Sequence, residues 1–126
     1  MYRVLIFDDD TDILDLCATI LRNKGFEVMT STSSETAIDR ISELEPDVIL
    51  MDNWMPGITG AETIMLLKKK EMFQHIPVIF FTANNQAEKL SILAGADYYL
   101  QKPFDINAFV EIVNRAVWDQ IPVLRS

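Results

Sequence analysis

Short runs of apolar residues alternate with amphipathic stretches five times along the chain. The clearest run extends from Val4 to Phe7, four apolar residues that stop abruptly at an aspartate. An unbroken apolar run of this length is typical of a strand buried on both faces of a sheet. Further runs follow at regular intervals, and the predicted strands cover residues 4–7, 27–30, 48–51, 78–81 and 98–100.

The segments between these strands have the spacing and the end signals of helices. Apolar residues within 13–21 fall on one helical stripe, and Gly25 follows as a C-terminal cap. Thr32 and Glu35 form a capping-box pair, which predicts a second helix reaching about Leu44. Three more helices are predicted, at about residues 60–71, 86–94 and 106–117.

Strands that alternate with helices of this length predict βαβ units and a parallel sheet. The sequence therefore predicts an α/β fold of the flavodoxin-like, doubly wound (βα)5 type. Its five-stranded parallel sheet has the order 2-1-3-4-5, with helices on both faces. In such sheets, ligands bind beyond the carboxyl ends of the strands, where the strand order reverses between the first and third strands.

The length of 126 residues fits one compact domain. We expect this domain at residues 1–118 and a C-terminal tail at residues 119–126. A net charge of −8 argues against direct binding to nucleic acid or to an anionic membrane surface. The single cysteine and the lack of an apolar run near the ~20 residues of a membrane span lead us to expect a cytoplasmic protein.

Aspartates gather where two of the predicted strands end. Asp8, Asp9 and Asp10 follow the first strand, and Asp52 follows the third. These carboxylates would converge at one edge of the sheet and repel each other, unless a proton or a hard cation neutralises them. Oxygen ligands suit Mg²⁺, with Mn²⁺ as a substitute. Asp10 fits a helix cap equally well.

Two further polar residues end strands at the same predicted edge. Thr82 follows the fourth strand and Lys102 follows the fifth. A phosphoryl group on a carboxylate would need such partners, because the ammonium neutralises its oxygens and the hydroxyl donates a hydrogen bond. Either residue alone carries little information, but all of these polar groups at strand ends together indicate phosphoryl chemistry.

With these residues in this order, the chain resembles the response regulator receiver domain of two-component signalling, in particular the single-domain, chemotaxis-regulator-like kind. The resemblance extends over about residues 3–117. The segments that carry it are residues 7–10, 50–57, 81–83 and 102–104.

The resemblance implies that Asp52 is a phosphoacceptor. The phosphoryl group would come from a histidine kinase or a histidine phosphotransfer protein. Asp8, Asp9 and Asp52 would hold Mg²⁺ together with the backbone carbonyl of Trp54.

Other positions take their expected roles from the same resemblance. Thr82, Ala83 and Lys102 would bind the phosphoryl oxygens, and the Lys102–Pro103 peptide bond would be cis. Tyr99 occupies the aromatic switch position of the family. Phosphorylation would then change the face formed by the fourth helix, fifth strand and fifth helix. The protein would act by docking a downstream protein on this face, or by passing its phosphoryl group onward in a relay. Tyr99 could instead be an ordinary half-buried strand aromatic.

Trp54 departs from the commonest pattern of the family, in which this position is usually polar or smaller. Our hypothesis is that the indole crowds the path of the attacking water and slows loss of the phosphoryl group. Asn84, two residues after Thr82, is the other position expected to tune dephosphorylation.

The leading interpretation is a phosphorylatable switch rather than an enzyme, with only self-phosphorylation from small donors and self-dephosphorylation. After Val117 only nine residues remain, too few for an output domain. We expect a monomer or a weak, phosphorylation-dependent dimer. The alternative is a receiver taken from a hybrid histidine kinase or from a longer regulator.

Two further classes are disfavoured. A phosphatase resembling haloacid dehalogenases needs a second aspartate two residues after the nucleophile, where this chain has Trp54. A pseudo-receiver that only binds a partner typically loses the acceptor, an acid or the lysine, and none of these is lost here.

Overall fold

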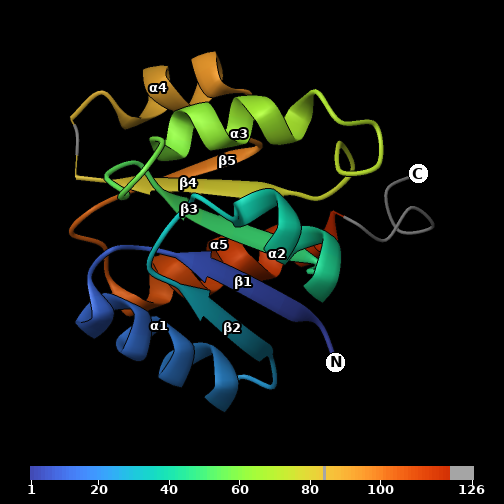
Figure 1. Cartoon of the computed structure of the whole chain (residues 1–126). Coiled ribbons are helices and arrows are strands. Elements are labelled where there is room, and N and C mark those ends of the chain that lie inside the picture. The colour runs from blue at the N-terminus through green and yellow to red at the C-terminus, as the bar shows by residue number, and fades with distance from the viewer. Residues whose placement is uncertain (84, 120–126) are drawn as a thin grey trace.

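The computed structural model describes residues 1–83 and 85–119, and within them five strands alternate with five helices. The strands are β1 (Arg3–Phe7), β2 (Glu27–Ser31), β3 (Val48–Asp52), β4 (Val78–Thr82) and β5 (Tyr98–Gln101). The helices are α1 (Thr11–Asn23), α2 (Ala37–Leu44), α3 (Gly60–Lys68), α4 (Ala87–Ala94) and α5 (Ile106–Trp118). All strand pairs are parallel, in the order β2-β1-β3-β4-β5 (Figure 1), which confirms the predicted fold class.

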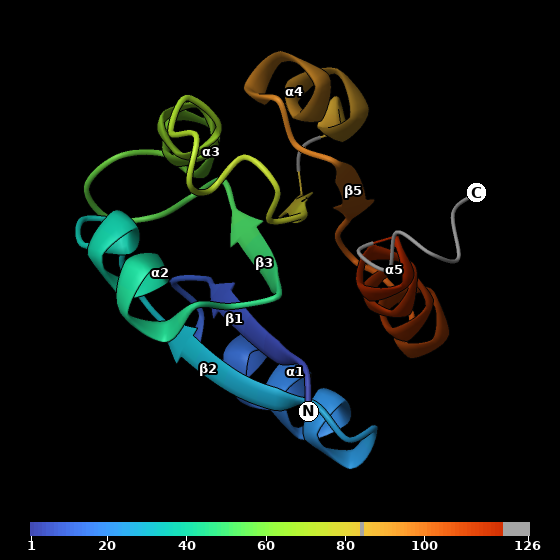
Figure 2. The ribbon, with the colours of Figure 1, turned by 90° about the vertical axis from the view of Figure 1, so that its right-hand side faces the viewer.

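Helices cover both faces of the sheet (Figure 2). The side chains of α1 and α5 pack on one face, where they meet Val4 and Ile6 of β1. The side chains of α2, α3 and α4 pack on the other face, where they meet Leu5 and Phe7. Because both faces of β1 are buried, its apolar run is continuous rather than alternating.

The start of α2 corrects the sequence prediction. The helix begins at Ala37, and its N-cap residue, Thr36, makes no side-chain capping bond. The backbone N–H of Glu35 donates instead to the hydroxyl of Ser33 at 3.2 Å, in the turn that precedes the helix. Serine hydroxyls compete in this way with helical backbone bonding, so the capping box expected from Thr32 does not form.

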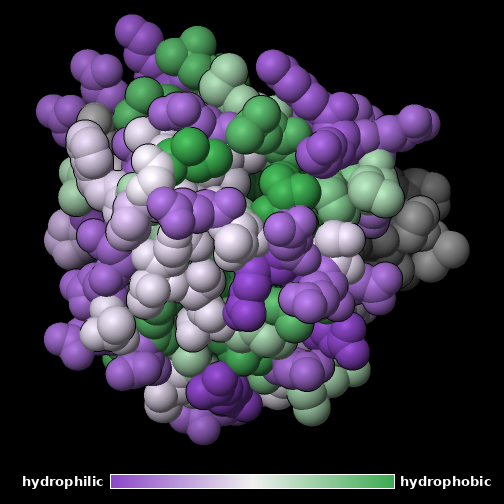
Figure 3. Space-filling view, viewed as in Figure 1, coloured by the Kyte–Doolittle hydropathy of each residue, from purple (hydrophilic) through white to green (hydrophobic). Residues whose placement is uncertain are grey.

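The end of α3 also differs from the prediction, since the helix stops at Lys68 rather than near residue 71. Met65 and Leu66 are exposed on the outer side of this helix. Figure 3 shows apolar side chains scattered among polar ones over the region of α2 and α3. Because apolar residues occur on both sides of α3, its sequence shows no clear amphipathic pattern. The pattern therefore did not indicate where the helix ends.

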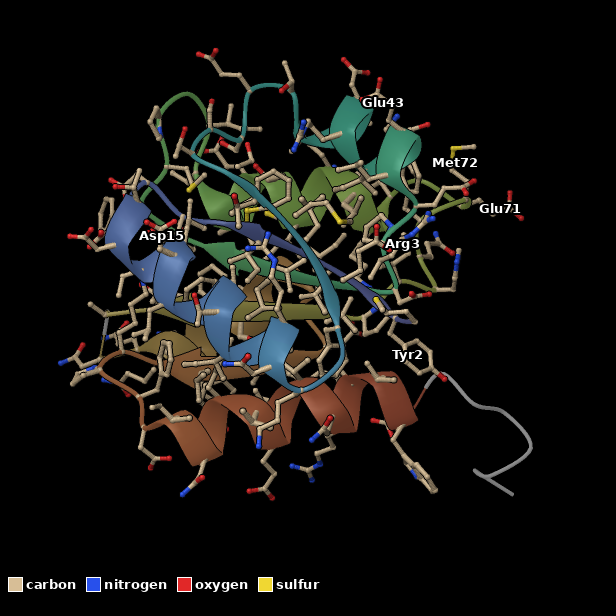
Figure 4. All side chains as sticks on the ribbon, turned by 90° about the horizontal axis from the view of Figure 1, so that it is seen from below. Tyr2, Arg3, Asp15, Glu43, Glu71 and Met72 are labelled. Carbon is tan, nitrogen blue, oxygen red and sulfur yellow. The ribbon has the colours of Figure 1, made fainter. Side chains whose placement is uncertain are left out.

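The carboxyl ends of the parallel strands share one edge of the sheet. Figure 4 shows Asp15 of α1 toward this edge and Tyr2 and Arg3 toward the opposite edge. The loops that follow β1, β3, β4 and β5 therefore meet where the site is expected. Of the predicted tail, Asp119 is described, and residues 120–126 lie outside the described part of the chain.

Candidate functional site

Three aspartates converge at the carboxyl edge of the sheet. Asp8, Asp9 and Asp52 each offer a carboxylate oxygen, and these oxygens all lie within 4.8 Å of one another. Asp8 and Asp52 are buried, whereas Asp9 is exposed. The topology thus brings together acids that are more than forty residues apart in the sequence.

Asp10 has a different role from its two neighbours. Its carboxylate accepts hydrogen bonds from the backbone N–H groups of Asp12 at 2.9 Å and Ile13 at 3.3 Å. These are free donors of the first turn of α1, so Asp10 is the helix N-cap. The sequence left this choice open, and the geometry assigns Asp10 to the cap.

The ammonium group of Lys102 lies between the two buried aspartates. Its Nζ is 2.6 Å from Oδ2 of Asp8 and 3.3 Å from Oδ1 of Asp52. It also lies 4.7 Å from the centre of the Phe81 ring, which forms one wall of the site. Lys102 therefore joins the loop after β5 to the ends of β1 and β3.

This arrangement leaves one ammonium facing three carboxylates. Burial, and after it the charge of Asp8, raise the pKa of the Asp52 carboxyl to about 6 against the opposing effect of Lys102. Burial alone would lower the pKa of Lys102, but its hydrogen bonds and attraction to Asp8 and Asp52 outweigh this and raise it. The cluster therefore carries an uncompensated negative charge at neutral pH.

Thr82 ends β4 beside this cluster and is buried. Its backbone carbonyl accepts a hydrogen bond from the N–H of Lys102 at 2.9 Å, which fixes the two strand ends side by side. Ala83 follows on the exposed surface. Asn84, the other residue predicted to tune dephosphorylation, lies outside the described residues.

The loop after β3 is held by a residue that the sequence analysis did not single out. The backbone carbonyl of Asn53 accepts from the N–H of Gly60 at 3.0 Å, and its side-chain oxygen accepts from the N–H of Ala61 at 3.2 Å. The side chain of Trp54, by contrast, is 62 % exposed. The indole predicted to crowd the site thus lies mostly in solvent.

Gly60 allows α3 to begin directly against the backbone of Asp52. A Cβ atom at this position would lie 2.0 Å from the carbonyl oxygen of Asp52, far inside van der Waals contact. Only glycine fits there without moving β3 or α3. Its position eight residues after Asp52 in a turn-rich loop was the signal available in the sequence.

Comparison with known proteins identifies the family. Residues 4–114 match the family model of the response regulator receiver domain. The chain belongs to this family. Receiver domains are the phosphoacceptor switches of two-component signalling, and the family binds Mg²⁺ at an acidic pocket.

Curated relatives are longer than this chain. The phosphate regulon transcriptional regulatory protein PhoB of Klebsiella pneumoniae is 34% identical over 104 residues, which is 81% of this chain and 45% of PhoB. The response regulator SaeR of Staphylococcus aureus is 34% identical over 116 residues, 90% of this chain and 50% of SaeR. The chain thus spans about half the length of the curated relatives it matches.

Solved receiver structures have the same fold. A CheY-like receiver domain protein from Methanospirillum hungatei has a TM-score of 0.86 at 28% identity, covering 95% of this chain and 96% of that one. The chemotaxis response regulator CheY4 of Vibrio cholerae has a TM-score of 0.85 at 27% identity, covering 92% and 98%. Within the described residues, no helix combines the length and the hydrophobicity needed to cross a membrane.

The donor set fits the Mg²⁺ that this family binds. Asp8, Asp9 and Asp52 supply hard oxygen ligands only, and the described residues contain no other group of three or more such side chains. The backbone carbonyl of Trp54 follows in the adjoining loop. An all-oxygen set with excess negative charge favours Mg²⁺ or Mn²⁺ over Zn²⁺.

Two further residues that the resemblance singled out lie on β5 or just after it. Tyr99 is exposed to 42 % of its surface on this strand. The peptide bond between Lys102 and Pro103 is cis, as the resemblance implied. Tyr99 is therefore accessible to solvent on the edge strand of the sheet.

Proposed function

We propose that Asp52 accepts a phosphoryl group from a phosphohistidine of a histidine kinase or histidine phosphotransfer protein. The observation that carries this proposal is the position of the Lys102 ammonium, in contact with both Asp8 and Asp52. A cation held at that point would meet the oxygens of a phosphoryl group on Asp52. The alternative of a pseudo-receiver has no support from such an arrangement.

The chemistry follows from the groups around Asp52. A carboxylate oxygen of Asp52 forms the new bond to phosphorus, the phosphorus–nitrogen bond of the donor breaks, and the imidazole leaves with the electron pair. The pKa of Asp52, about 6, keeps most of this carboxyl ionised and nucleophilic at neutral pH. Mg²⁺ bound by Asp8, Asp9, Asp52 and the Trp54 carbonyl would neutralise charge on the transferred group.

Lys102, Thr82 and Ala83 are proposed to receive the phosphoryl oxygens. The Lys102 ammonium would exchange its contact with Asp52 for one with the phosphoryl group. The Thr82 hydroxyl and the backbone N–H of Ala83 would donate hydrogen bonds to it. These three groups lie at or just after the ends of β4 and β5. Phosphorylation would therefore displace the ends of both strands.

Movement of Thr82 is proposed to be coupled to Tyr99. In this proposal the ring of Tyr99 turns inward and changes the face of α4, β5 and α5, which then binds a downstream protein. The exposure of Tyr99, which stands in an outward position for a ring that would turn inward, supports this proposal.

Trp54 and Asn84 are proposed to set the lifetime of the phosphoryl group. Trp54 follows the acceptor by two residues, so its indole could swing over the path of the attacking water. Trp54→Asn is expected to speed dephosphorylation about tenfold, which corresponds to a barrier lower by about 1.4 kcal/mol. An unchanged rate would refute the role of the indole.

The length of the curated relatives favours a second arrangement of the same chemistry. Because the chain matches about half of PhoB and SaeR, it fits the receiver segment of a longer regulator or hybrid kinase as well as a single-domain switch. In either case we propose a cytoplasmic, monomeric or weakly dimeric receiver without direct contact to nucleic acid.

Phosphorylation of the purified chain by acetyl phosphate tests the proposal. With Mg²⁺ present, intact mass should rise by one phosphoryl group, and the adduct should be stable in acid and labile in base. Asp52→Asn should show no adduct, whereas Asp39→Asn, which removes an exposed acid from α2, should react like the parent protein. An adduct that survives Asp52→Asn would overturn the assignment.

A further inference from the structure

The connection from β2 to α2 touches the connection from β3 to α3 through one buried serine. The side chain of Ser34 is 2 % exposed. Its hydroxyl donates to the backbone carbonyl of Ile58 at 2.5 Å, and the carbonyl of Pro56 lies 3.4 Å away. A single hydroxyl thus joins two loops that are separated by more than twenty residues.

The fit between the two loops extends beyond this hydrogen bond. Gly57 has a φ of +91°, and a Cβ atom there would lie 2.5 Å from Cγ of Glu35, the residue next to Ser34. Glycine therefore serves both the backbone turn and the close approach of the Glu35 side chain. The loop after β3 therefore approaches the connection before α2 closely at this glycine.

The same loop carries the Trp54 carbonyl, one of the proposed Mg²⁺ ligands. On one side of Trp54, Asn53 is bonded to the start of α3. On the other side, Met55 is buried in the core under α2 and α3, and Pro56 and Ile58 lie on Ser34. Of these contacts, the hydrogen bond from Ser34 is the one that comes from outside the loop after β3, namely from the connection between β2 and α2.

We infer that Ser34 is a positioning residue for the cation site. By fixing the carbonyls of the loop at Pro56 and Ile58, its hydroxyl limits how far the peptide plane at Trp54 can turn. Mg²⁺ demands near-ideal octahedral geometry, so a carbonyl ligand that is free to turn binds it less tightly. This inference rests on the proposed Mg²⁺ site, and it adds a residue with no contact to the ion.

The test is the affinity for Mg²⁺ of Ser34→Ala in the full chain. Trp118→Phe supplies a background in which Trp54, in the loop itself, is the single indole. A Mg²⁺ titration followed by Trp54 fluorescence, and a Mn²⁺ titration followed by the electron paramagnetic resonance signal of free Mn²⁺, give two independent readouts. Ser34→Ala is expected to weaken binding about tenfold, the low end for residues that orient metal ligands.

Ser91→Ala is the matched control. Ser91 is as buried as Ser34, and its hydroxyl donates to the Tyr98 carbonyl at 3.4 Å, away from the loop after β3. Its loss should lower the thermal midpoint without changing the affinity for Mg²⁺. The difference between the two variants therefore separates positioning from general stability.

Each outcome decides the inference. A weaker affinity in Ser34→Ala alone supports it. Equal affinities in Ser34→Ala and the parent, or equal losses in both serine variants, overturn it while leaving the proposed function intact. If the parent binds neither cation, or if Asp9→Asn binds as the parent does, the proposed cation site fails first and the role of Ser34 falls with it.

Discussion

Two lysines with similarly buried side chains lie at opposite edges of the sheet, in clusters that differ in their balance of charge. Lys102 lies at the carboxyl edge with a side chain 18% exposed, and Lys68 lies at the end of α3 with a side chain 16% exposed. Nζ of Lys68 contacts Oδ2 of Asp97 at 2.8 Å and the carbonyls of Gln74 and Ile76 at 3.2 and 2.8 Å. That carboxylate also accepts from the N–H of Val78 at 2.8 Å.

The difference lies in the charge balance of the two clusters. At Lys68, one ammonium meets one carboxylate and two backbone carbonyls, so its donors and its charge are satisfied. At Lys102, one ammonium meets two buried carboxylates with Asp9 close by. Removing one partner from a balanced cluster destabilises the fold, whereas an unbalanced cluster is left with an affinity for a further cation. We therefore expect removal of a carboxylate to change the free energy of unfolding in opposite directions at the two edges of the sheet.

The largest effect is expected at the balanced cluster. Lys68→Met should lower the free energy of unfolding by about 2–3 kcal/mol, because it removes the donor to two carbonyls and the cation beside the Asp97 carboxylate. Urea denaturation measures this change. Lys69→Met, at the exposed neighbouring position, should change stability by less than about 0.5 kcal/mol. Equal effects of the two substitutions would contradict the role of Lys68.

The unbalanced cluster should respond to charge removal with the opposite sign. In EDTA near pH 7.5, Asp52→Asn should raise the free energy of unfolding by about 2 kcal/mol, because it removes a carboxylate whose pKa is raised on folding. Asp97→Asn, which leaves Lys68 without its carboxylate, should lower it by about 1 kcal/mol. If both substitutions changed the free energy of unfolding in the same direction, the two clusters would not differ in their balance of charge.

The pH dependence of stability isolates the same effect. The folded state holds the Asp52 proton with a pKa of about 6, above the ordinary 3.8. Between these values the native protein binds more protons than the unfolded chain, so the free energy of unfolding falls as pH rises. Relative to Asp52→Asn, the parent protein in EDTA should lose stability from about pH 4 to 6, by at most about 1.4 kcal/mol per pH unit. Parallel curves would show that Asp52 carries no such penalty.

The smallest effect concerns competition between Lys102 and a bound cation. In Lys102→Met, added Mg²⁺ should raise the thermal midpoint by about 2–4 °C more than in the parent, because the ammonium no longer neutralises Asp8 and Asp52. Lys68→Met should show the same Mg²⁺ shift as the parent. If Mg²⁺ raised the thermal midpoint of Lys68→Met more than that of the parent, the ion would not bind specifically at the Lys102 edge of the sheet.

The sequence predicted the unbalanced cluster far better than the balanced one. Asp8, Asp52 and Thr82 end continuous apolar runs, and parallel strands place such ends at one edge. Lys68 and Asp97 follow no such rule, because their pairing depends on how the end of α3 lies against the turn between α4 and β5. The pattern of apolar residues does not encode that contact.

Residues that support the site were missed for a related reason. Asn53, Gly60 and Ser34 act through contacts made by loops and by the first residues of α3, and such contacts follow no periodic pattern in the sequence. Gly60 is needed because α3 begins against the backbone of Asp52, and Ser34 because it reaches a carbonyl after β3. The choice between cap and ligand at Asp10 likewise depended on side-chain direction, which only the structure supplies.

The unbalanced carboxylate cluster is proposed to accept a phosphoryl group at Asp52. Borohydride reduces an aspartyl phosphate to homoserine, so a protein treated with acetyl phosphate and Mg²⁺, then with borohydride, carries a permanent mark at the modified residue. Peptide mass spectrometry should find homoserine at position 52, and only when Mg²⁺ was present. Homoserine at Asp8 or Asp9 instead, or none at any position, would contradict the account.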